Sequence, residues 1–572
     1  MPTGESLLAG MLRETRGWSA LYLTTALCSA ATVLLLPTAL ADAVNAALSP
    51  GSSPAPLLRL AALLAVACLL DMAAELAEVK TSTRSTAWLR HRLVGHLLRL
   101  DLRGQQRHAS GDALSRFLQG TAEAARLAPV AVSGSTSVLV SLGGLIALFL
   151  IDPRSGLLFL LGAPLVLLIA RAFFHRSARL TEDYQRVHGE LAARFMDAMR
   201  GARSIRAADS AGREAARILA PLPELRRHGE RFWLAQRDAG LHVSLIVPVL
   251  QVGVLATAGY GVADGRLAPG DLLAVTGYLQ LAFGLFGQIA VVGGLGRVRG
   301  SAGRLREILA VRRAPAGRTP FPPGGGALTL AGVRVTHDDG VALDGIDLAI
   351  PAGRLVAVVG ESGAGKSTLA AVVGGLLTPD AGRVTLDGVD LADADPDALR
   401  REVAYAFERP ALLGRTVQDA LGYGDRPLPE ESLIAGQQAS CADEFVAKLP
   451  QGPHTPLNDL RASGGEFQRL GLARALSRPS RLLILDNATS SLDMISERRI
   501  AGALRARSGT RLVVTHRRSA AETADLVLWL ADGTVAGFGP HRQLLHLPGY
   551  AALFHAGPEP AVPPTAREEA AP

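Results

Sequence analysis

A glycine-rich segment in the second half of the chain has the residue spacing of a phosphate-binding loop. Residues 360–367 read Gly-Glu-Ser-Gly-Ala-Gly-Lys-Ser and fit the pattern G-x-x-x-x-G-K-[ST] without departure. An apolar strand is expected just before the loop and a helix just after it, so the helix N-terminus adds positive potential. Lys366 is expected to reach the β and γ phosphates of a nucleotide, and Ser367 to ligate Mg²⁺. The predicted nucleotide-binding residues of this segment are Gly360, Glu361, Ser362, Gly363, Ala364, Gly365, Lys366, Ser367 and Thr368.

A second apolar strand, 481–485, ends in Asp486. A carboxylate at a strand end beside a phosphate loop holds Mg²⁺, so Asp486 is predicted to be a metal ligand. His516 follows a third strand, 512–515, where its imidazole can contact a γ-phosphate. The predicted cofactors are therefore ATP and Mg²⁺.

Between these strands lies a second candidate phosphate cradle. A serine and two glycines precede the helix expected at 467–476, and Ser491, Leu492 and Asp493 come after Asp486. One nucleotide does not need two cradles, so the second one predicts a dimer in which each molecule lends its cradle to the other's nucleotide. The residues of this second cradle are Ser463, Gly464, Gly465 and Glu466.

The elements ahead of these motifs are apolar enough to cross a membrane. A bilayer core needs roughly 20 apolar residues in a helix. Six such stretches are present, at residues 18–40, 57–79, 128–151, 155–174, 241–263 and 271–295. The sequence therefore predicts a multi-domain membrane protein, with an all-α six-helix transmembrane domain (1–313) followed by an α/β P-loop ATPase domain. We expect a linker at 314–326, the ATPase domain at 327–555 and a disordered tail at 556–572.

The distribution of charge orients the six spans. The two long loops, 80–127 and 175–240, carry nine and thirteen Lys and Arg residues, whereas the three short loops carry at most one each. Since Lys and Arg stay on the cytoplasmic side, both termini, both long loops and the ATPase domain are predicted to be cytoplasmic, in the inner membrane. Few prolines interrupt the long loops. We expect them to be helical extensions that turn at short crosspieces, Gln106–Arg116 and Gly201–Glu214.

Composition excludes several other classes of protein. Of 572 residues, 48% are hydrophobic and 19% are charged, which excludes a disordered or fibrous chain. The net charge of +7 is accounted for by the membrane topology, so no nucleic-acid partner is expected. The three cysteines lack the spacing of a metal site or a disulfide framework.

Polar residues inside the spans are candidates for a substrate cavity, because they are costly there. Asp71 and Glu75 lie four residues apart in the second span, on one helix face. The alternative is that this part of the helix already lies in water or pairs with an arginine. Gln251 and Gln280 are weaker candidates of the same kind.

The set of motifs resembles the ATP-binding cassette (ABC) transporter family, and the six-span half resembles exporter-type half-transporters. By position, Gly360–Ser367 matches the Walker A motif, Asp486 the Walker B aspartate, Ala462–Glu466 the signature, Ser491–Asp493 the D-loop and His516 the switch histidine. The two predicted crosspieces match the family's coupling helices. The resemblance implies a transport ATPase in which two halves sandwich two ATP molecules.

Three departures from the family pattern fall on one nucleotide site. Asn487 stands where the family has the glutamate that acts as general base. Glu408 stands where it has the Q-loop glutamine, a ligand of Mg²⁺ and water, and His337 where an aromatic residue stacks on adenine. The signature also begins with Ala462 instead of leucine. An amide cannot take the proton of the attacking water, which typically costs 10²–10⁴ in rate.

These departures predict a hydrolysis-impaired site in one half of a heterodimer whose second half has an intact catalytic glutamate. The expected activity is ATP-driven export of a small or amphipathic molecule across the cytoplasmic membrane, with membrane lipid as a further contact. Import of a metal chelate on the same fold remains open, as does a regulatory ATP sensor that does not pump.

Overall fold

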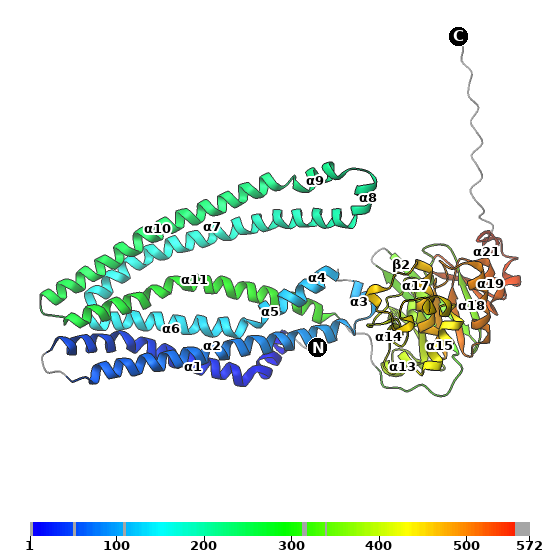
Figure 1. Ribbon diagram of the computed structural model, residues 1–572, viewed down its shortest axis with the longest axis horizontal. Coiled ribbons are helices and arrows are strands. Elements are labelled where there is room, and N and C mark those ends of the chain that lie inside the picture. Colours follow the sequence, from blue (N-terminus) through cyan, green and yellow to red (C-terminus); the bar gives the residue numbers. More distant parts are fainter. Residues whose placement is uncertain (1–3, 50–52, 107–109, 312–316, 338–339, 555–572) are drawn as a thin grey trace, which may run out of the picture. The chain divides into compact units, whose positions relative to one another are not determined.

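The structure is a computed structural model that describes residues 4–49, 53–106, 110–311, 317–337 and 340–554. The chain forms two compact units (Figure 1). The first contains residues 1–98 and 109–311, and the second contains residues 99–108 and 312–572. The predicted tail, 556–572, and the start of the predicted linker, 314–316, lie outside the described residues.

Long helices build the first unit and lie side by side in pairs, α1 with α2, α6 with α11 and α7 with α10 (Figure 1). These helices are α1 (Gly4–Leu48), α2 (Ala55–Leu97), α6 (Leu127–Ile151), α7 (Pro153–Arg200), α10 (Leu222–Ala263) and α11 (Pro269–Ala310). Shorter segments connect them: α4 (Ser110–Ser115), a π-helical turn (Arg116–Gly120), α5 (Thr121–Ala125), α8 (Ala202–Ala207) and α9 (Ala211–Leu219).

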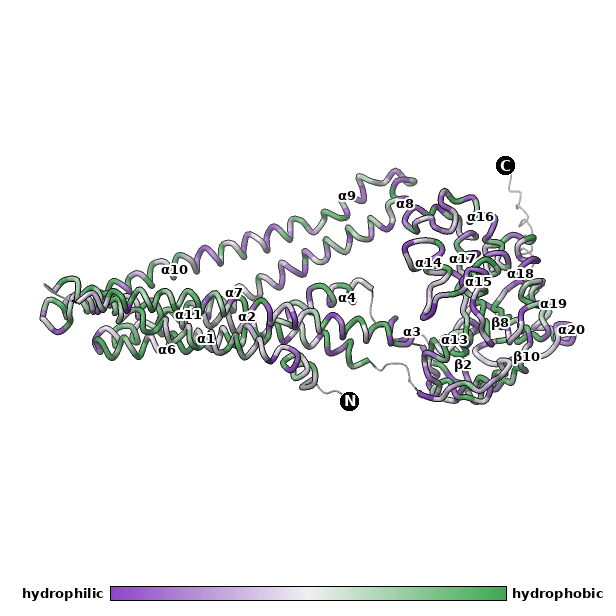
Figure 2. Tube along the Cα trace, turned by 60° about the horizontal axis from the view of Figure 1, so that its bottom comes forward, coloured by the Kyte–Doolittle hydropathy of each residue, from purple (hydrophilic) through white to green (hydrophobic). Residues whose placement is uncertain are grey.

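Five helical segments of the described residues are long and apolar enough to span a membrane: Ala9–Leu48, Ala55–Leu97, Gly111–Ile151, Pro153–Phe173 and Ser244–Ala263. Three predicted spans, 18–40, 57–79 and 128–151, lie wholly within these segments, and two more, 155–174 and 241–263, overlap Pro153–Phe173 and Ser244–Ala263 except at one end. The sixth, 271–295, lies in α11, where the side chains of residues 287–293 are outside the described set. Figure 2 shows the apolar residues concentrated along α1, α6 and α11. The helices α2 and α7 run far beyond their apolar stretches, so the long loops are helical extensions, as predicted.

Two β-sheets and the helices around them form the second unit. An antiparallel sheet has the order β2-β1-β4-β5, and a six-stranded sheet has the order β10-β9-β3-β8-β7-β6. In the second sheet β3 is parallel to both neighbours, with Ala357 opposite Val513 on β8 and Val527 on β9. The strands are β1 (Leu328–His337), β2 (Gly340–Ile350), β3 (Leu355–Val359), β4 (Ala381–Leu386), β5 (Val389–Asp390), β6 (Val403–Ala406), β7 (Leu482–Asp486), β8 (Thr510–Val514), β9 (Leu526–Ala531) and β10 (Thr534–Gly539).

The six-stranded sheet is buried on both faces, as the unbroken apolar runs of β3 and β7 require. One face packs with α12 and the smaller sheet around Val358, Leu369 and Ile484. The helices of this unit are α12 (Lys366–Val373), α13 (Pro396–Glu402), α14 (Val417–Leu421), α15 (Glu430–Ala439), α16 (Asp443–Ala447), α17 (Gly464–Leu476), α18 (Met494–Ala506), α19 (Arg518–Thr523), α20 (His541–Leu544) and α21 (Pro548–Ala552), with single 3₁₀ turns at Gly452–His454 and Leu457–Asp459.

The first crosspiece differs from the prediction. A short helix, α3 (Leu102–Gln106), packs with the second unit instead of the first. The Leu102 N–H donates to the carbonyl oxygen of Leu376 (3.0 Å), and Arg103 forms a two-pronged ion pair with Asp380. The segment begins before the predicted Gln106–Arg116, because Asp101 accepts a hydrogen bond from the Gly104 N–H (2.8 Å) and turns the chain there. The second predicted crosspiece, Gly201–Glu214, contains α8 and the start of α9.

Candidate nucleotide site

The phosphate loop connects the end of β3 to the start of α12, and its backbone requires glycine at two positions. Gly360 has φ +152°, and a Cβ atom there would lie 2.2 Å from the carbonyl oxygen of Leu530. Gly365 has φ +91°, and its Cβ would lie 2.4 Å from the carbonyl oxygen of Ala342. Any side chain would displace neighbouring backbone, so these glycines shape a cradle that approaches a phosphate with main-chain atoms only.

Lys366 begins α12 and points back into the loop. Its side chain is buried, and Nζ donates to the carbonyl oxygens of Gly360 (2.9 Å) and Glu361. Burial lowers the pKa of Lys366, while the negative charges of Asp486 and Glu361 act in the opposite direction. A poorly hydrated ammonium inside a ring of backbone groups binds phosphate oxygens strongly, because little water has to be displaced.

The predicted metal ligands lie next to each other. Ser367 Oγ donates to one oxygen of Asp486 (2.8 Å), and Tyr405 Oη donates to the other (3.1 Å). A hydroxyl and a carboxylate beside a phosphate cradle are the oxygen ligands that Mg²⁺ takes together with phosphates and water. Tyr405, on β6, was not identified from the sequence. Its pKa is raised well above the ordinary value by burial and by the neighbouring Asp486 carboxylate.

Asn487 follows Asp486 directly and adopts a left-handed backbone conformation, with φ +49°. Its N–H donates to the carbonyl oxygen of Val514 (3.2 Å), and its own carbonyl accepts from the Ser490 N–H (3.1 Å). Asparagine tolerates this conformation better than most residues with a side chain. The backbone at this position is therefore fixed from both sides.

The other two predicted catalytic groups, His516 and Glu408, are exposed. Although the His516 side chain is exposed overall, partial desolvation of its ring lowers its pKa, the charge of Lys366 lowers it further, and Glu408 acts in the opposite direction. All three side chains thus act electrostatically on the same region. His337, the predicted adenine-stacking residue, lies beside the loop helix, with Nε2 3.4 Å from Thr368 Oγ1.

The signature residues form the N-terminus of α17. Ser463 is the N-cap, since its Oγ accepts from the Glu466 N–H (3.3 Å) and the Glu466 carboxylate accepts in return from the Ser463 N–H (2.7 Å). The Ser463 N–H and the Ser463 hydroxyl both donate to the Glu466 carboxylate and lower its pKa. Ser463 and Gly464 are exposed, and Gly465 packs close to the carbonyl oxygen of Ser491. The N–H groups of Ser463 and Glu466 are used in this cap, so the part of the helix N-terminus that can face a docking phosphate is the exposed backbone at Gly464.

The D-loop, Ser491–Asp493, leads into α18. Asp493 caps this helix by accepting hydrogen bonds from the N–H groups of Ile495 (3.0 Å) and Ser496 (2.9 Å), which lower its pKa. Arg517 is the residue after His516, and its guanidinium donates a hydrogen bond to the Leu492 carbonyl oxygen (3.0 Å). This bond connects the segment that carries His516 to the D-loop.

Gln468 on α17 connects its own helix to the loop at Glu408 and to the loop at Ser490–Ser491, and it was not identified from the sequence. Its side chain is only 4% exposed. Its amide nitrogen donates to the Glu408 carbonyl oxygen (3.0 Å) and to Ser490 Oγ (2.9 Å), and its amide oxygen accepts from the Ser491 N–H (2.9 Å). The available signal was a glutamine on the face of α17 that otherwise carries Leu and Ala residues.

The candidate cavity residues of the first unit lie on three helices. Asp71 of α2 accepts a hydrogen bond from Ser29 Oγ of α1 (2.5 Å), so this carboxylate faces the neighbouring helix. Glu75, also on α2, is exposed, as is Gln280 on α11, and Gln251 on α10 is half-buried. Their role in substrate binding remains a prediction.

Both halves of the chain match one family. Residues 343–490 match the ABC transporter family, and residues 19–286 match the ABC transporter transmembrane region. The chain belongs to the ABC transporter family. The ABC transporter ATP-binding protein RamA of Streptomyces coelicolor is 41% identical, over 95% of this chain and 86% of the relative.

More distant relatives extend the comparison. The ATP-dependent lipid A-core flippase of Chromobacterium violaceum is 31% identical over 82% of each chain. The solved structure of a bacterial Atm1-family ABC exporter with ATP bound has a TM-score of 0.78 and 25% identity, and the match covers 94% of this chain and 98% of that one. The predicted fold class is confirmed: a helical transmembrane region precedes an α/β nucleotide-binding domain. The chain is a multi-pass, ATP-binding half-transporter of exporter type.

Proposed function

We propose that this ABC half-transporter pairs with a different half and that its own ATP site binds Mg²⁺-ATP with little hydrolysis. The observation that carries the proposal is Asn487, an amide at the position directly after the Asp486 carboxylate. Proton transfer to a positioned base contributes 10²–10⁴ in rate, and an amide has no basic pKa to supply it. Binding does not need the base, because Lys366, Ser367 and Asp486 are placed for phosphate and Mg²⁺.

A homodimer of this chain would contain no catalytic glutamate at either site. A partner with an intact glutamate supplies one hydrolysing site, and the exposed Ser463 and Gly464 complete that site from this side. The charge distribution of the loops favours an inner-membrane protein with cytoplasmic termini. The transported molecule is proposed to be small or amphipathic, with Asp71, Glu75, Gln251 and Gln280 as candidates for its contacts.

The first test measures steady-state ATPase of the purified chain. We expect MgATP binding with turnover far below 1 s⁻¹, and Asn487→Glu should raise turnover modestly, because Glu408 and His337 also depart from the family pattern. Asn487→Gln is the matched control, since it places an equally long side chain at φ +49° without a carboxylate. Turnover near 1 s⁻¹ in the unmodified chain would overturn the proposal, as it would reveal another base.

The second test assigns the two sites in the co-purified complex. Ser463→Arg adds bulk where the α17 N-terminus must approach the partner's γ-phosphate, so we expect ATPase and transport to be abolished. Lys366→Ala affects only the holding site and should weaken ATP binding there while leaving measurable hydrolysis. The reverse order of damage would mean that this chain carries the working site.

Transport assays distinguish the remaining alternatives. ATP-dependent release of substrate from the cytoplasmic side supports export. ATP-dependent uptake would favour the metal-chelate importer, and ATP binding by the complex without any translocation would favour the regulatory sensor.

A further inference from the structure

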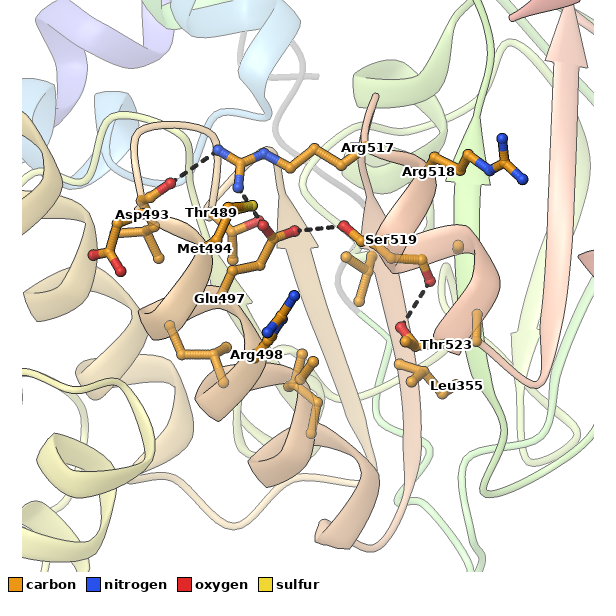
Figure 3. A pocket seen from close by; sticks show the side chains of 18 residues that line it. Leu355, Thr489, Asp493, Met494, Glu497, Arg498, Arg517, Arg518, Ser519 and Thr523 are labelled. Atoms are coloured by element: carbon orange, nitrogen blue, oxygen red, sulfur yellow. Dashed lines mark hydrogen bonds and ion pairs between the residues drawn. The ribbon is translucent and has the colours of Figure 1, made fainter. Parts of the chain in front are cut away.

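A hollow that is partly open to solvent lies in the second unit on the side of the six-stranded sheet covered by α18 and α19 (Figure 3). Its volume is about 540 Å³, within the range of roughly 300–1,000 Å³ typical of small-molecule sites. The floor is apolar and comes from β3, β8 and α18, through Leu355, Ala357, Val513, Ile500 and Leu504. Each of these side chains is at most 7% exposed. None of them takes part in the nucleotide site described above.

The acidic groups at the mouth of this cavity are already occupied. Glu497 pairs with Arg517 and accepts a hydrogen bond from Ser519 Oγ (3.2 Å), as Figure 3 shows. Asp493 is used as the cap of α18. Neither carboxylate therefore has much capacity left for a cationic ligand.

Of the three arginines that line the cavity, two are paired with carboxylates and one is not. Arg517 is paired with Glu497, and Arg518 is paired with Glu522 at 2.7 Å. Arg498, which also lines the cavity, has no hydrogen-bond or ion-pair partner within the described part of the chain. An apolar floor with one unpaired guanidinium at its rim matches an apolar molecule that carries a single anionic group.

We propose that this cavity is a binding site for a small anionic amphiphile, with the apolar body on the Leu355–Val513 floor and the anionic group on Arg498. The site is built only from this chain and does not depend on the identity of the second half. Leu492 and Asp493 of the D-loop form part of its wall. A bound molecule would therefore contact the D-loop. Arg517, the residue after His516, is hydrogen-bonded to this loop at Leu492.

The experiment uses the full chain in lipid nanodiscs and 2-naphthoate as the probe, with binding followed by saturation-transfer NMR titration. We expect saturable binding that weakens roughly three- to tenfold in Arg498→Gln, as expected for the loss of one charged contact at a partly exposed rim. The matched control is Arg499→Gln, the next residue of α18, whose side chain points to Glu444 (3.4 Å) and does not line the cavity. The neutral analogue 2-naphthamide should bind the unmodified chain more weakly and should be insensitive to Arg498→Gln.

A second variant tests the cavity by volume. Ala501 lines the cavity, so Ala501→Phe should abolish probe binding, whereas Ala506→Phe, at the exposed end of the same helix, should not. Retained MgATP binding verifies that each variant is folded. The proposal is overturned if the unmodified chain shows no saturable binding, or if Arg498→Gln and its control behave alike, because the probe then only partitions into lipid.

Discussion

Replacement of Gln468 by leucine tests whether one buried amide holds α17 and two ATP-site loops together. The variant Gln468→Leu keeps the approximate volume of the side chain but removes its hydrogen bonds to Glu408, Ser490 and Ser491. A typical hydrogen bond contributes about 1 kcal/mol net, so the gross loss is about 3 kcal/mol. The three partner residues are exposed and regain water, and the leucine gains from burial. We therefore expect a net loss of about 2 kcal/mol.

The assay is thermal unfolding of the full-length protein, where a loss of this size lowers the midpoint of the nucleotide-binding domain by roughly 4–8 °C. Gln437→Leu is the matched control, because Gln437 is similarly buried but donates only one hydrogen bond, to Leu433 of its own helix (3.2 Å). Its midpoint should fall by less than half as much. Equal shifts in the two variants would refute the reasoning that Gln468 links the loops.

Three further predictions concern other contacts of the second unit. Tyr405→Phe removes the hydrogen bond to Asp486, so MgATP affinity should fall about fivefold while Mg²⁺-free ATP binding is unchanged in a binding titration. In a double-mutant cycle of thermal unfolding, Arg103→Ala and Asp380→Ala should couple by about 0.2–1 kcal/mol, since both side chains are partly exposed; additivity would contradict the pair. Burial lowers the pKa of His541, so the unfolded state takes up its proton first as pH falls below about 6.5 and stability is lost there. His541→Gln should reduce this acid sensitivity in unfolding midpoints measured between pH 7.5 and 5.5.

The sequence predicted the parts of the site that are encoded locally. The phosphate loop, Asp486 and the signature serine are each recognisable within a few residues, because a strand end or a helix N-terminus determines their geometry. The long helical extensions were also predictable, since their polar stretches keep a helical pattern with few prolines.

Contacts between distant segments were not predictable in the same way. Tyr405 and Gln468 act through partners 81 and 22 to 60 residues away, and nothing in their neighbouring residues indicates those partners. The first crosspiece was predicted at Gln106–Arg116, which is too late in the chain. Asp101 caps the turn earlier in the chain instead. An aspartate that can cap a turn is visible in the sequence, but this loop contains several other residues that could cap a turn equally well, so the sequence alone does not select Asp101.

The length of α7 separates its two ends into different electrostatic environments. Its 48 residues extend about 72 Å, whereas a bilayer core accounts for only about 30 Å. Since the long loops are proposed to be cytoplasmic, the other end of α7, at Pro153, would face outward, and the arginines of α8 would stand about 40 Å beyond the hydrocarbon core. That distance is several Debye lengths at physiological salt, where screening acts over about 8 Å. Anionic lipids should therefore influence the arginines near the bilayer, whereas Arg203 and Arg206 remain insulated from the lipid composition of the membrane.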